Sequence, residues 1–413
     1  MLNLKDFNNK NPSHRLRKEI VVLATIGLLI IPTIYLYTYI LYPSFEASEL
    51  PAIDLLCDNE INDDTYVECI FELDSERIKA EVRLRGDTAS KYPKKSYRLQ
   101  LSTPKALLGM RKDDDWILLS LYNDHQRLNT KLSMDIWRSL DDDNPTAILP
   151  KSRYVKLFIN GEFYGLYLLA EKEDKSLFKL DEARNNIHSS LIFQAKYWTT
   201  LDNYETNSWE QDWPNEEEGI YIMDTILTEL ISFISNTSDE VFFDPIEGIY
   251  SKFEKLNLID FYLFNYFIQH KDFWSKNYFI VRQTYPSKFF LIPWDFDSSI
   301  GGRWGLYDAK ENREIIIREK NVLFNRLLNN YEFRQECKIR WIDLRENLWT
   351  DDFILDMASD NYEEIKDILG LELRMWGRHN TKEKDIDIGE EVNKLFEWLS
   401  DRLAFCDLYF SEI

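Results

Sequence analysis

The first half of the chain alternates apolar and polar positions, as half-buried strands do. Between residues 50 and 172, the runs TYVECIFEL, IKAEVRLRG, KKSYRLQL and DDWILLS are separated by turn-forming residues. The run SRYVKLFINGEFYGLYLLAEK places Asn-Gly between two β-rich stretches, which predicts a tight hairpin. We expect one helix here, at about Asn129 to Leu140. The pattern predicts a β-rich N-terminal lobe over residues 50–180.

The second half of the chain has apolar residues at three- and four-residue spacing, as amphipathic helices do. Examples are IMDTILTELISFIS, LIDFYLFNYFIQH and IGEEVNKLFEWLSDRLAFCDLYF. Residues 181–219 are polar and are expected to form a long surface segment. A short β hairpin, NYFIVRQTYPSKFFLIPW, interrupts the helices. The pattern predicts a mostly helical C-terminal lobe over residues 181–413, and so a two-lobed α+β fold.

An apolar stretch near the N-terminus is long enough to span a bilayer. Residues 20–42 carry no charge, and about 20 such residues suffice for a transmembrane helix. Basic residues precede the stretch, which places the N-terminus in the cytoplasm. We expect a cytoplasmic segment over residues 1–18, a single signal-anchor helix over 19–42, and the main domain outside the cytoplasm. A buried soluble helix is the alternative.

The net charge and the cysteine positions limit the partners and metal sites that this protein is expected to have. The formal net charge is −22. Residues 1–18 hold five cations and one carboxylate, or +4, so the remainder carries about −26. A surface this acidic repels phosphate backbones, which argues against nucleic acid as a partner. Four cysteines, at positions 57, 69, 337 and 406, allow three disulfide pairings or free thiols, and none has zinc-ligand spacing.

Two carboxylates follow an apolar run in FFLIPWDFDSS, residues 289–299. Phe289 to Trp294 read as a buried strand, so Asp295 and Asp297 emerge where it leaves the core. Like charges gathered there are explained by a bound cation, by acid–base chemistry or by turn capping. Mg²⁺ prefers such hard oxygen ligands. The pattern therefore indicates a candidate metal site.

A second block stands before the same hairpin. HKDFWSKN, residues 270–277, has the H-[R/K]-D-x₄-N spacing of a protein-kinase catalytic loop, in which the Asp accepts the substrate hydroxyl proton and the Asn binds metal. Because a hairpin returns on itself, Asn277 and Asp295 should meet at one end of the sheet. The spacing predicts Asp272 as the catalytic base or substrate-orienting residue. It also predicts Asn277, Asp295 and Asp297 as metal ligands.

Phosphate-binding cations are expected in VRLRGDTASKYPKKSYRLQL, residues 82–101. Arg85 ends one strand, and Lys94 and Lys95 open the next, where arginine could clamp phosphates bidentately. Glu171, at the end of GLYLLAEK, could pair with the phosphate-binding lysine. The alternatives are lysines that protect a strand edge and a plain surface carboxylate. The chain has neither G-x-G-x-x-G nor G-x₄-G-K-[ST].

Five blocks of the sequence, taken together, resemble the CotH spore-coat protein kinase family. They are RGDTASKYPKKSYRLQL, FINGEFYGLYLLAEK, HKDFWSKNYF, PWDFDSSIGG and LFNRLLNNYEFR. The resemblance runs over roughly residues 60–410, in the family's order. It implies an atypical kinase with a kinase-like fold that uses ATP and Mg²⁺ or Mn²⁺ to phosphorylate Ser or Thr of a protein. The loop R-G-D-T-A-S departs from the family's common R-G-x-S-S. Carried over by position, the resemblance implicates Arg85, Lys94 or Lys95, Asp272, Asn277, Asp295 and Asp297.

We therefore expect a membrane-anchored atypical kinase with a protein substrate. A glycosyltransferase that uses D-x-D to bind metal and a nucleotide sugar is the second enzymatic hypothesis, but it gives HKDFWSKN and PKKSY no role. A catalytically inactive kinase-like protein for cell-surface assembly is the third hypothesis, since ATP is scarce outside the cytoplasm.

Overall fold

The computed structural model describes residues 48–413, apart from residues 87–90, 125, 303–306 and 378–387. The predicted basic segment and signal-anchor helix, residues 1–18 and 19–42, lie outside the described residues. None of the helices in the described part combines the length and the apolar character that crossing a bilayer requires.

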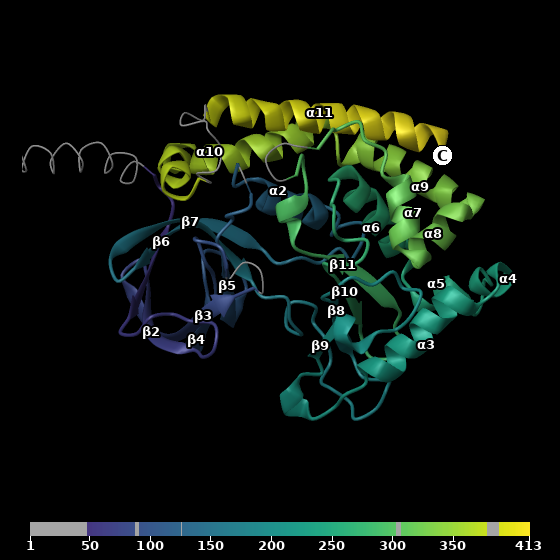
Figure 1. Cartoon of the computed structure of the whole chain (residues 1–413), viewed down its shortest axis with the longest axis horizontal. Coiled ribbons are helices and arrows are strands. Elements are labelled where there is room, and N and C mark those ends of the chain that lie inside the picture. Colours follow the sequence, from purple (N-terminus) through teal and green to yellow (C-terminus); the bar gives the residue numbers. More distant parts are fainter. Residues whose placement is uncertain (1–47, 87–90, 125, 303–306, 378–387) are drawn as a thin grey trace, which may run out of the picture.

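The N-terminal part is a closed β-barrel with strand order β1-β2-β3-β4-β5-β7-β6 (Figure 1). Only the β1–β6 contact is parallel, and the other neighbours are antiparallel. Alternate side chains fill the interior, among them Val82, Leu99 and Trp116. The strands are β1 (Ala52–Cys57), β2 (Val67–Leu73), β3 (Glu76–Arg85), β4 (Ser96–Ala106), β5 (Lys112–Leu119), β6 (Ser152–Ile159) and β7 (Glu162–Glu171).

The predicted Asn-Gly hairpin is confirmed. Strands β6 and β7 pair across Asn160 and Gly161, whose φ angles are 53° and 76°. Positive φ at both central residues is the signature of the turn that matches strand twist, and Asn-Gly adopts it at low cost.

A second sheet, of order β11-β10-β8-β9, lies beside the barrel (Figure 1). It contains the predicted hairpin, as β10 (Tyr278–Arg282) and β11 (Phe289–Pro293). The prediction that residues 181–219 form only a surface segment is wrong, because β8 (Leu191–Ala195) and β9 (Trp209–Trp213) extend the sheet. Strand β8 is a short apolar run that pairs with β10, far along the chain, and is buried by that pairing.

The C-terminal part is mostly helical, so the predicted α+β layout, β-rich then helical, is confirmed. The helices are α2 (Asn129–Arg138), α3 (Met223–Asn236), α4 (Asp239–Phe242), α5 (Ile249–Lys252), α6 (Lys255–Phe267), α7 (Glu314–Lys320), α8 (Val322–Asn329), α9 (Tyr331–Asn347), α10 (Asp351–Trp376) and α11 (Ile388–Glu412).

Helix α2 precedes the last two barrel strands in sequence but packs with the C-terminal helices. Its Trp137 ring lies 5.1 Å from that of Phe264 in α6, and both belong to one core cluster. Helices α10 and α11 lie against each other along one side of the molecule. Helix α10 also contacts both α2 and barrel strand β7, so it spans the barrel and the helical part.

Of the pairings left open by the sequence, the structure forms one disulfide. Cys57 and Cys69 are opposite each other in β1 and β2 and are bonded, with their Cα atoms 4.3 Å apart. Cys337 and Cys406 are buried thiols in the helical part. The disulfide therefore cross-links β1 and β2, the first two strands of the barrel.

Candidate active site

The β10–β11 hairpin brings Asn277 and Asp295 to the same end of the second sheet, as its topology predicts. Tyr278 is paired with Pro293, and the backbone N–H of Trp294 donates to the carbonyl of Asn277 at 2.9 Å. Asn277 and Asp295 both have left-handed backbones, with φ of 63° and 61°. Such conformations cost energy for residues other than glycine and are concentrated at functional sites.

His270 ties the catalytic-loop-like segment to the segment that carries the two carboxylates. Its Nε2 lies 2.9 Å from the carbonyl oxygen of Asp295, and its Nδ1 lies 3.1 Å from Oδ1 of Asn265. The imidazole is fully buried, and burial lowers its pKa to about 4, so it is neutral near pH 7. The backbone N–H of Lys271 also donates to the carbonyl of Ser298. His270 therefore has a structural role in fixing Asp295.

Asp272 lies two residues beyond His270 and is half-buried. Its Oδ2 is 3.4 Å from Nζ of Lys276, and the Asp272 side chain keeps 21% of its surface exposed. A carboxylate with this partial exposure is accessible to a substrate hydroxyl, which the role predicted for Asp272 requires.

A small cavity of about 100 Å³ brings three predicted site residues together: Arg85, Asp295 and Asp297. Oδ2 of Asp297 accepts a hydrogen bond from Nδ2 of Asn123 at 2.8 Å, and Oδ1 accepts one from Ser298 Oγ at 2.9 Å. The cavity thus places two carboxylates and a guanidinium side by side.

Arg85 also lines a much larger cleft, of about 1,620 Å³, between the barrel and the second sheet. Its Nη2 is 3.0 Å from Oε1 of Glu173, which follows β7. Across the cleft, burial and the charges of Glu210 and Glu173 raise the pKa of Asp212 to about 7. Arg85 therefore lies where the large cleft meets the carboxylate cavity.

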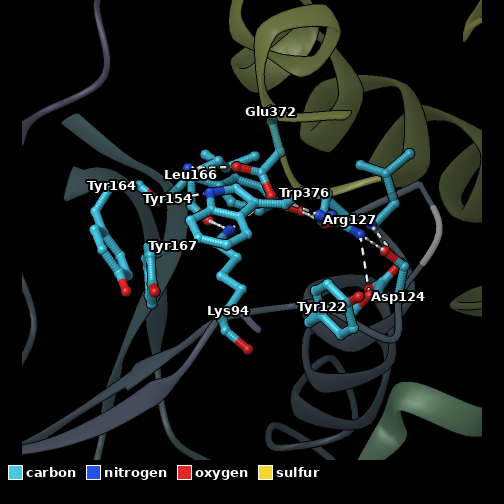
Figure 2. A network of polar contacts seen from close by, with 12 residues as sticks. Lys94, Tyr122, Asp124, Arg127, Tyr154, Tyr164, Leu166, Tyr167, Glu372 and Trp376 are labelled. Atoms are coloured by element: carbon cyan, nitrogen blue, oxygen red, sulfur yellow. Dashed lines mark hydrogen bonds and ion pairs between the residues drawn. The ribbon is translucent and has the colours of Figure 1, made fainter. Parts of the chain in front are cut away.

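Lys94 does not reach this cavity but lies in a fully buried ion cluster (Figure 2). Its Nζ is 2.6 Å from Oε1 of Glu372 and donates to the carbonyl of Leu166. Nε of Arg127 donates to the same carboxylate oxygen at 2.9 Å. Burial alone would raise the pKa of Glu372, but Lys94 and Arg127 lower it below its ordinary value. Glu372 is thus an ionised carboxylate shared by Arg127 and Lys94, and burial lowers the pKa of the Lys94 ammonium to about 7.

The backbone of β7 approaches this cluster so closely that only glycine fits. Gly165 has a φ of 125°, and a Cβ there would lie 2.7 Å from Oε2 of Glu372 and 2.9 Å from Nε1 of Trp376. The next residue, Leu166, donates its backbone N–H to Oε2 of Glu372 at 2.9 Å. Gly165, in the second strand of the predicted hairpin, is therefore required for α10 to pack this closely against the barrel.

The predicted pairing of Glu171 with the phosphate-binding lysine is wrong for Lys94. Glu171 is buried at the end of β7, where its carboxylate accepts the backbone N–H groups of Arg111 and Lys151 at 2.8 and 2.9 Å. It therefore stabilises turns of the barrel, while Glu372 supplies the carboxylate for Lys94. Lys95 is half-buried, and its carbonyl accepts the hydroxyl of Tyr167 at 2.8 Å. A phosphate contact by Lys94 or Lys95 stays a prediction.

The loop between β5 and α2 supplies residues that the sequence analysis missed, namely Asn123, Asp124 and Arg127. The carboxylate of Asp124 accepts the backbone N–H groups of Leu128 and Thr130 at 3.1 and 2.9 Å, so it caps the start of α2. Burial raises the pKa of Asp124 to about 6, although these N–H groups and Arg127 oppose the change.

One signal for Glu372 was present in the sequence. Ile365, Leu369, Glu372 and Trp376 fall at helical spacing on one stripe, in which Glu372 is the only charged residue. A carboxylate on an apolar stripe needs a buried partner. No local pattern identifies that partner as Lys94, because 278 residues separate them.

The donor chemistry at the hairpin end fits a hard cation. Asp295 and Asp297 line one cavity, and the amide-bearing Asn277 is joined to Trp294 beside them. Within the described residues, no group of three His, Cys, Asp or Glu side chains is placed to hold a metal ion. The carboxylates of Asp295 and Asp297 are the hard oxygen ligands that Mg²⁺ takes together with substrate phosphates, whereas Asn277 is not among the residues that line this cavity.

Comparisons with known proteins decide the family. A family model described as "CotH kinase protein" matches residues 82–406. The chain belongs to the CotH kinase family. It is therefore an atypical protein kinase, as the resemblance in the sequence implies. No curated protein matches the chain.

Among solved structures, the chain is similar to the Helicobacter pylori proinflammatory kinase CtkA, with 9% identity, a TM-score of 0.26, and coverage of 87% of this chain and 97% of that one. It is also similar to the Golgi casein kinase, with 8% identity, a TM-score of 0.27, and coverage of 89% and 75%. Both TM-scores lie below 0.5, and no conclusion about this CotH kinase rests on them.

Replacement of Glu372 should destabilise the protein strongly. Glu372→Ala leaves Lys94 and Arg127 buried without their shared carboxylate, a change that typically costs about 3–5 kcal/mol. The matched control is Glu363→Ala on the same helix, which removes an exposed ion pair with Lys366 and should cost less than about 1 kcal/mol. Urea unfolding of the full chain in detergent measures both. Equal losses would contradict a structural role for Glu372.

The buried carboxyl of Asp124 should make stability depend on pH. Its pKa is about 6 in the folded state against an ordinary value of 3.8, so the folded protein holds the proton more tightly. The resulting stability is present in full below pH ~4 and is lost as the pH rises through ~6. The stability of the wild type relative to Asp124→Asn should fall by about 2 kcal/mol between pH 4 and pH 7. Parallel stability curves would show that Asp124 titrates normally.

Proposed function

We propose that this CotH kinase transfers the γ-phosphoryl group of ATP to a Ser or Thr hydroxyl of a protein, with Mg²⁺ or Mn²⁺ at the carboxylate cavity. The observation that carries the proposal is the position of Arg85, which lines both the large cleft and the cavity of Asp295 and Asp297. A nucleotide lying in the cleft would present its phosphates to Arg85 and to the carboxylates at once.

The residues assigned to the site have separate roles in this proposal. Arg85 binds phosphate oxygens through its planar fork of N–H donors. Asp295, Asp297 and Asn277 hold the metal ion, which when bound neutralises negative charge on the phosphates. Asp272 orients the acceptor hydroxyl and accepts its proton. Catalysis then comes mainly from positioning and charge neutralisation.

Lys94 contributes through the ion cluster. Its ammonium is held by Glu372 and by the carbonyl of Leu166, next to the start of β4 and the end of β3. In this arrangement Lys94 fixes the strand ends that carry Arg85 and Lys95. Lys95, next in the chain and half-buried, is the lysine to which we assign a phosphate contact in this proposal.

We also propose that the kinase is anchored by residues 19–42 with its main domain outside the cytoplasm. The support is the Cys57–Cys69 disulfide, because disulfides persist in oxidising compartments and are rare in the cytosol. The basic residues that precede the apolar stretch give the same orientation.

Asp295→Ala should abolish metal-dependent nucleotide binding while the fold persists. The test is thermal unfolding of the full chain in detergent with ATP and Mg²⁺ or Mn²⁺, singly and together. The wild type should be stabilised only when both ligands are present, since each completes the site of the other. Asp295→Ala should lose this stabilisation and any transfer of phosphate to protein.

Three outcomes would contradict the proposal or part of it. No shift of the wild type with any ligand combination would favour the inactive, structural alternative. Stabilisation by a nucleotide sugar with metal, but not by ATP, would favour the glycosyltransferase. An Asp295→Ala protein that unfolds, or that keeps full activity, would remove Asp295 from the metal site.

The compartment can be tested through the cysteines. In intact cells, quenched with acid and denatured, a maleimide should label two of the four cysteines, and all four after reduction. A Cys57→Ser variant should show three labelled thiols before and after reduction, provided that Cys69 forms no other disulfide. Labelling of all four wild-type thiols without reduction would place the domain in a reducing compartment and contradict the proposed topology.

A further inference from the structure

One segment of the chain, from Asn123 to Ser133, surrounds the residues that follow Asp295. Nδ2 of Asn123 donates to Oδ2 of Asp297 at 2.8 Å. Nδ2 of Asn129 donates to the carbonyls of Ser299 and Ile300 at 3.0 and 3.2 Å. The hydroxyls of Ser133 and Ser299 are 2.9 Å apart. Side chains from the loop and from the first turns of α2 therefore hold three of the four residues 297–300.

Asn123 acts on the carboxylate itself. It is buried, with 6% of its surface exposed, and it lines the cavity together with Asp295 and Asp297. Its donation to one carboxylate oxygen, and that of Ser298 to the other, fix the plane of the Asp297 carboxylate. An ionised acceptor makes such bonds stronger than bonds between neutral groups.

The loop that carries Asn123 is itself anchored at its other end. Arg127 binds Glu372 through Nε and donates to the carbonyl of Asp124 through Nη1. Leu121 and Arg127 have positive φ angles of 54° and 63°, conformations that persist in non-glycine residues only where their surroundings impose them. The loop therefore joins the buried ion cluster of Lys94 to the carboxylate of Asp297 over five residues.

We propose that Asn123 is a positioning residue of this kinase, which orients Asp297 for metal binding and links that orientation to the Lys94–Glu372–Arg127 cluster. The inference rests on the proposed metal–nucleotide site and adds a residue that no sequence motif indicates. Asn123 acts through Asp297 and is not itself a metal ligand in this proposal.

The reason to expect an effect on metal binding is geometric. A carboxylate that rotates freely must be immobilised when it binds a cation, whereas one held by two donors is already ordered. Hydrogen-bonding partners of metal ligands typically change metal affinity by about 10–100-fold when they are removed. Loss of the Asn123 amide should therefore weaken the cation site.

The molecule contains a matched control for the same chemical change. Asn144 is also buried, with 2% of its surface exposed, and its Nδ2 donates to Oδ2 of Asp260 at 2.9 Å. This pair joins the segment after α2 to α6 and shares no residue with the cavity. Asn144→Ala removes a buried amide–carboxylate hydrogen bond without touching Asp297.

The experiment titrates Mn²⁺ into the full chain in detergent at a fixed concentration of a non-hydrolysable ATP analogue. Bound Mn²⁺ is followed by electron paramagnetic resonance, so the readout does not depend on turnover. Asn123→Ala should raise the half-saturating Mn²⁺ concentration by about tenfold or more. Asn144→Ala should leave it unchanged, although both variants lose thermal stability. In an Asp297→Asn background, Asn123→Ala should cause little further change in the half-saturating Mn²⁺ concentration, because the two residues act as one unit.

Three other outcomes would contradict the role proposed for Asn123. If Asn123→Ala and Asn144→Ala both bind Mn²⁺ like the wild type, Asn123 is only structural and the inference is wrong. If Asn123→Ala weakens Mn²⁺ binding equally with and without the Asp297→Asn change, the effect does not pass through Asp297. If the wild type itself binds no Mn²⁺ with the nucleotide analogue, the proposed function fails, and the inference fails with it.

Discussion

The structure depends on one buried carboxylate that two cations share. Glu372 comes from α10, Lys94 from the approach to β4 and Arg127 from the loop before α2, and the backbone N–H of Leu166 in β7 completes the cluster. Removal of the shared carboxylate leaves both cations buried without their charge partner, which is far costlier than loss of a surface ion pair. The barrel, the loop before α2 and helix α10 are therefore held in one arrangement.

Sequence separation between contacting residues decides which parts of the site could be predicted from the sequence. The β10–β11 hairpin, the Asn-Gly turn and the two aspartates that follow β11 depend on contacts within about 20 residues, so local pattern and turn chemistry indicate them. Strand β8 and Glu372 also depend on partners far along the chain, namely β10 and Lys94. Glu171 was the plausible partner for Lys94 by position, yet nearby backbone N–H groups bind it instead.

The link from Glu372 to the carboxylate cavity gives the C-terminal helices a part in the site. Arg127 touches Glu372, and four residues earlier Asn123 touches Asp297. On the other side, His270 binds the carbonyl of Asp295. The backbone carbonyl of Asp295 and the carboxylate of Asp297 are thus each held by a buried side chain, His270 and Asn123. These contacts fix the backbone at Asp295 and the carboxylate at Asp297 independently of a bound cation.

The pairing of Arg85 with Glu173 has a further consequence for nucleotide binding. Arg85 is held at 3.0 Å by a carboxylate that keeps only 10% of its side-chain surface exposed, and one oxygen of Glu173 has no hydrogen-bond partner among the described residues. A phosphate that reaches Arg85 must therefore share the guanidinium with Glu173 or displace it. Since Arg85 has five N–H donors and Glu173 occupies few of them, sharing is the less costly route. A guanidinium that stays anchored at one end can present its remaining donors to the phosphates in a fixed direction.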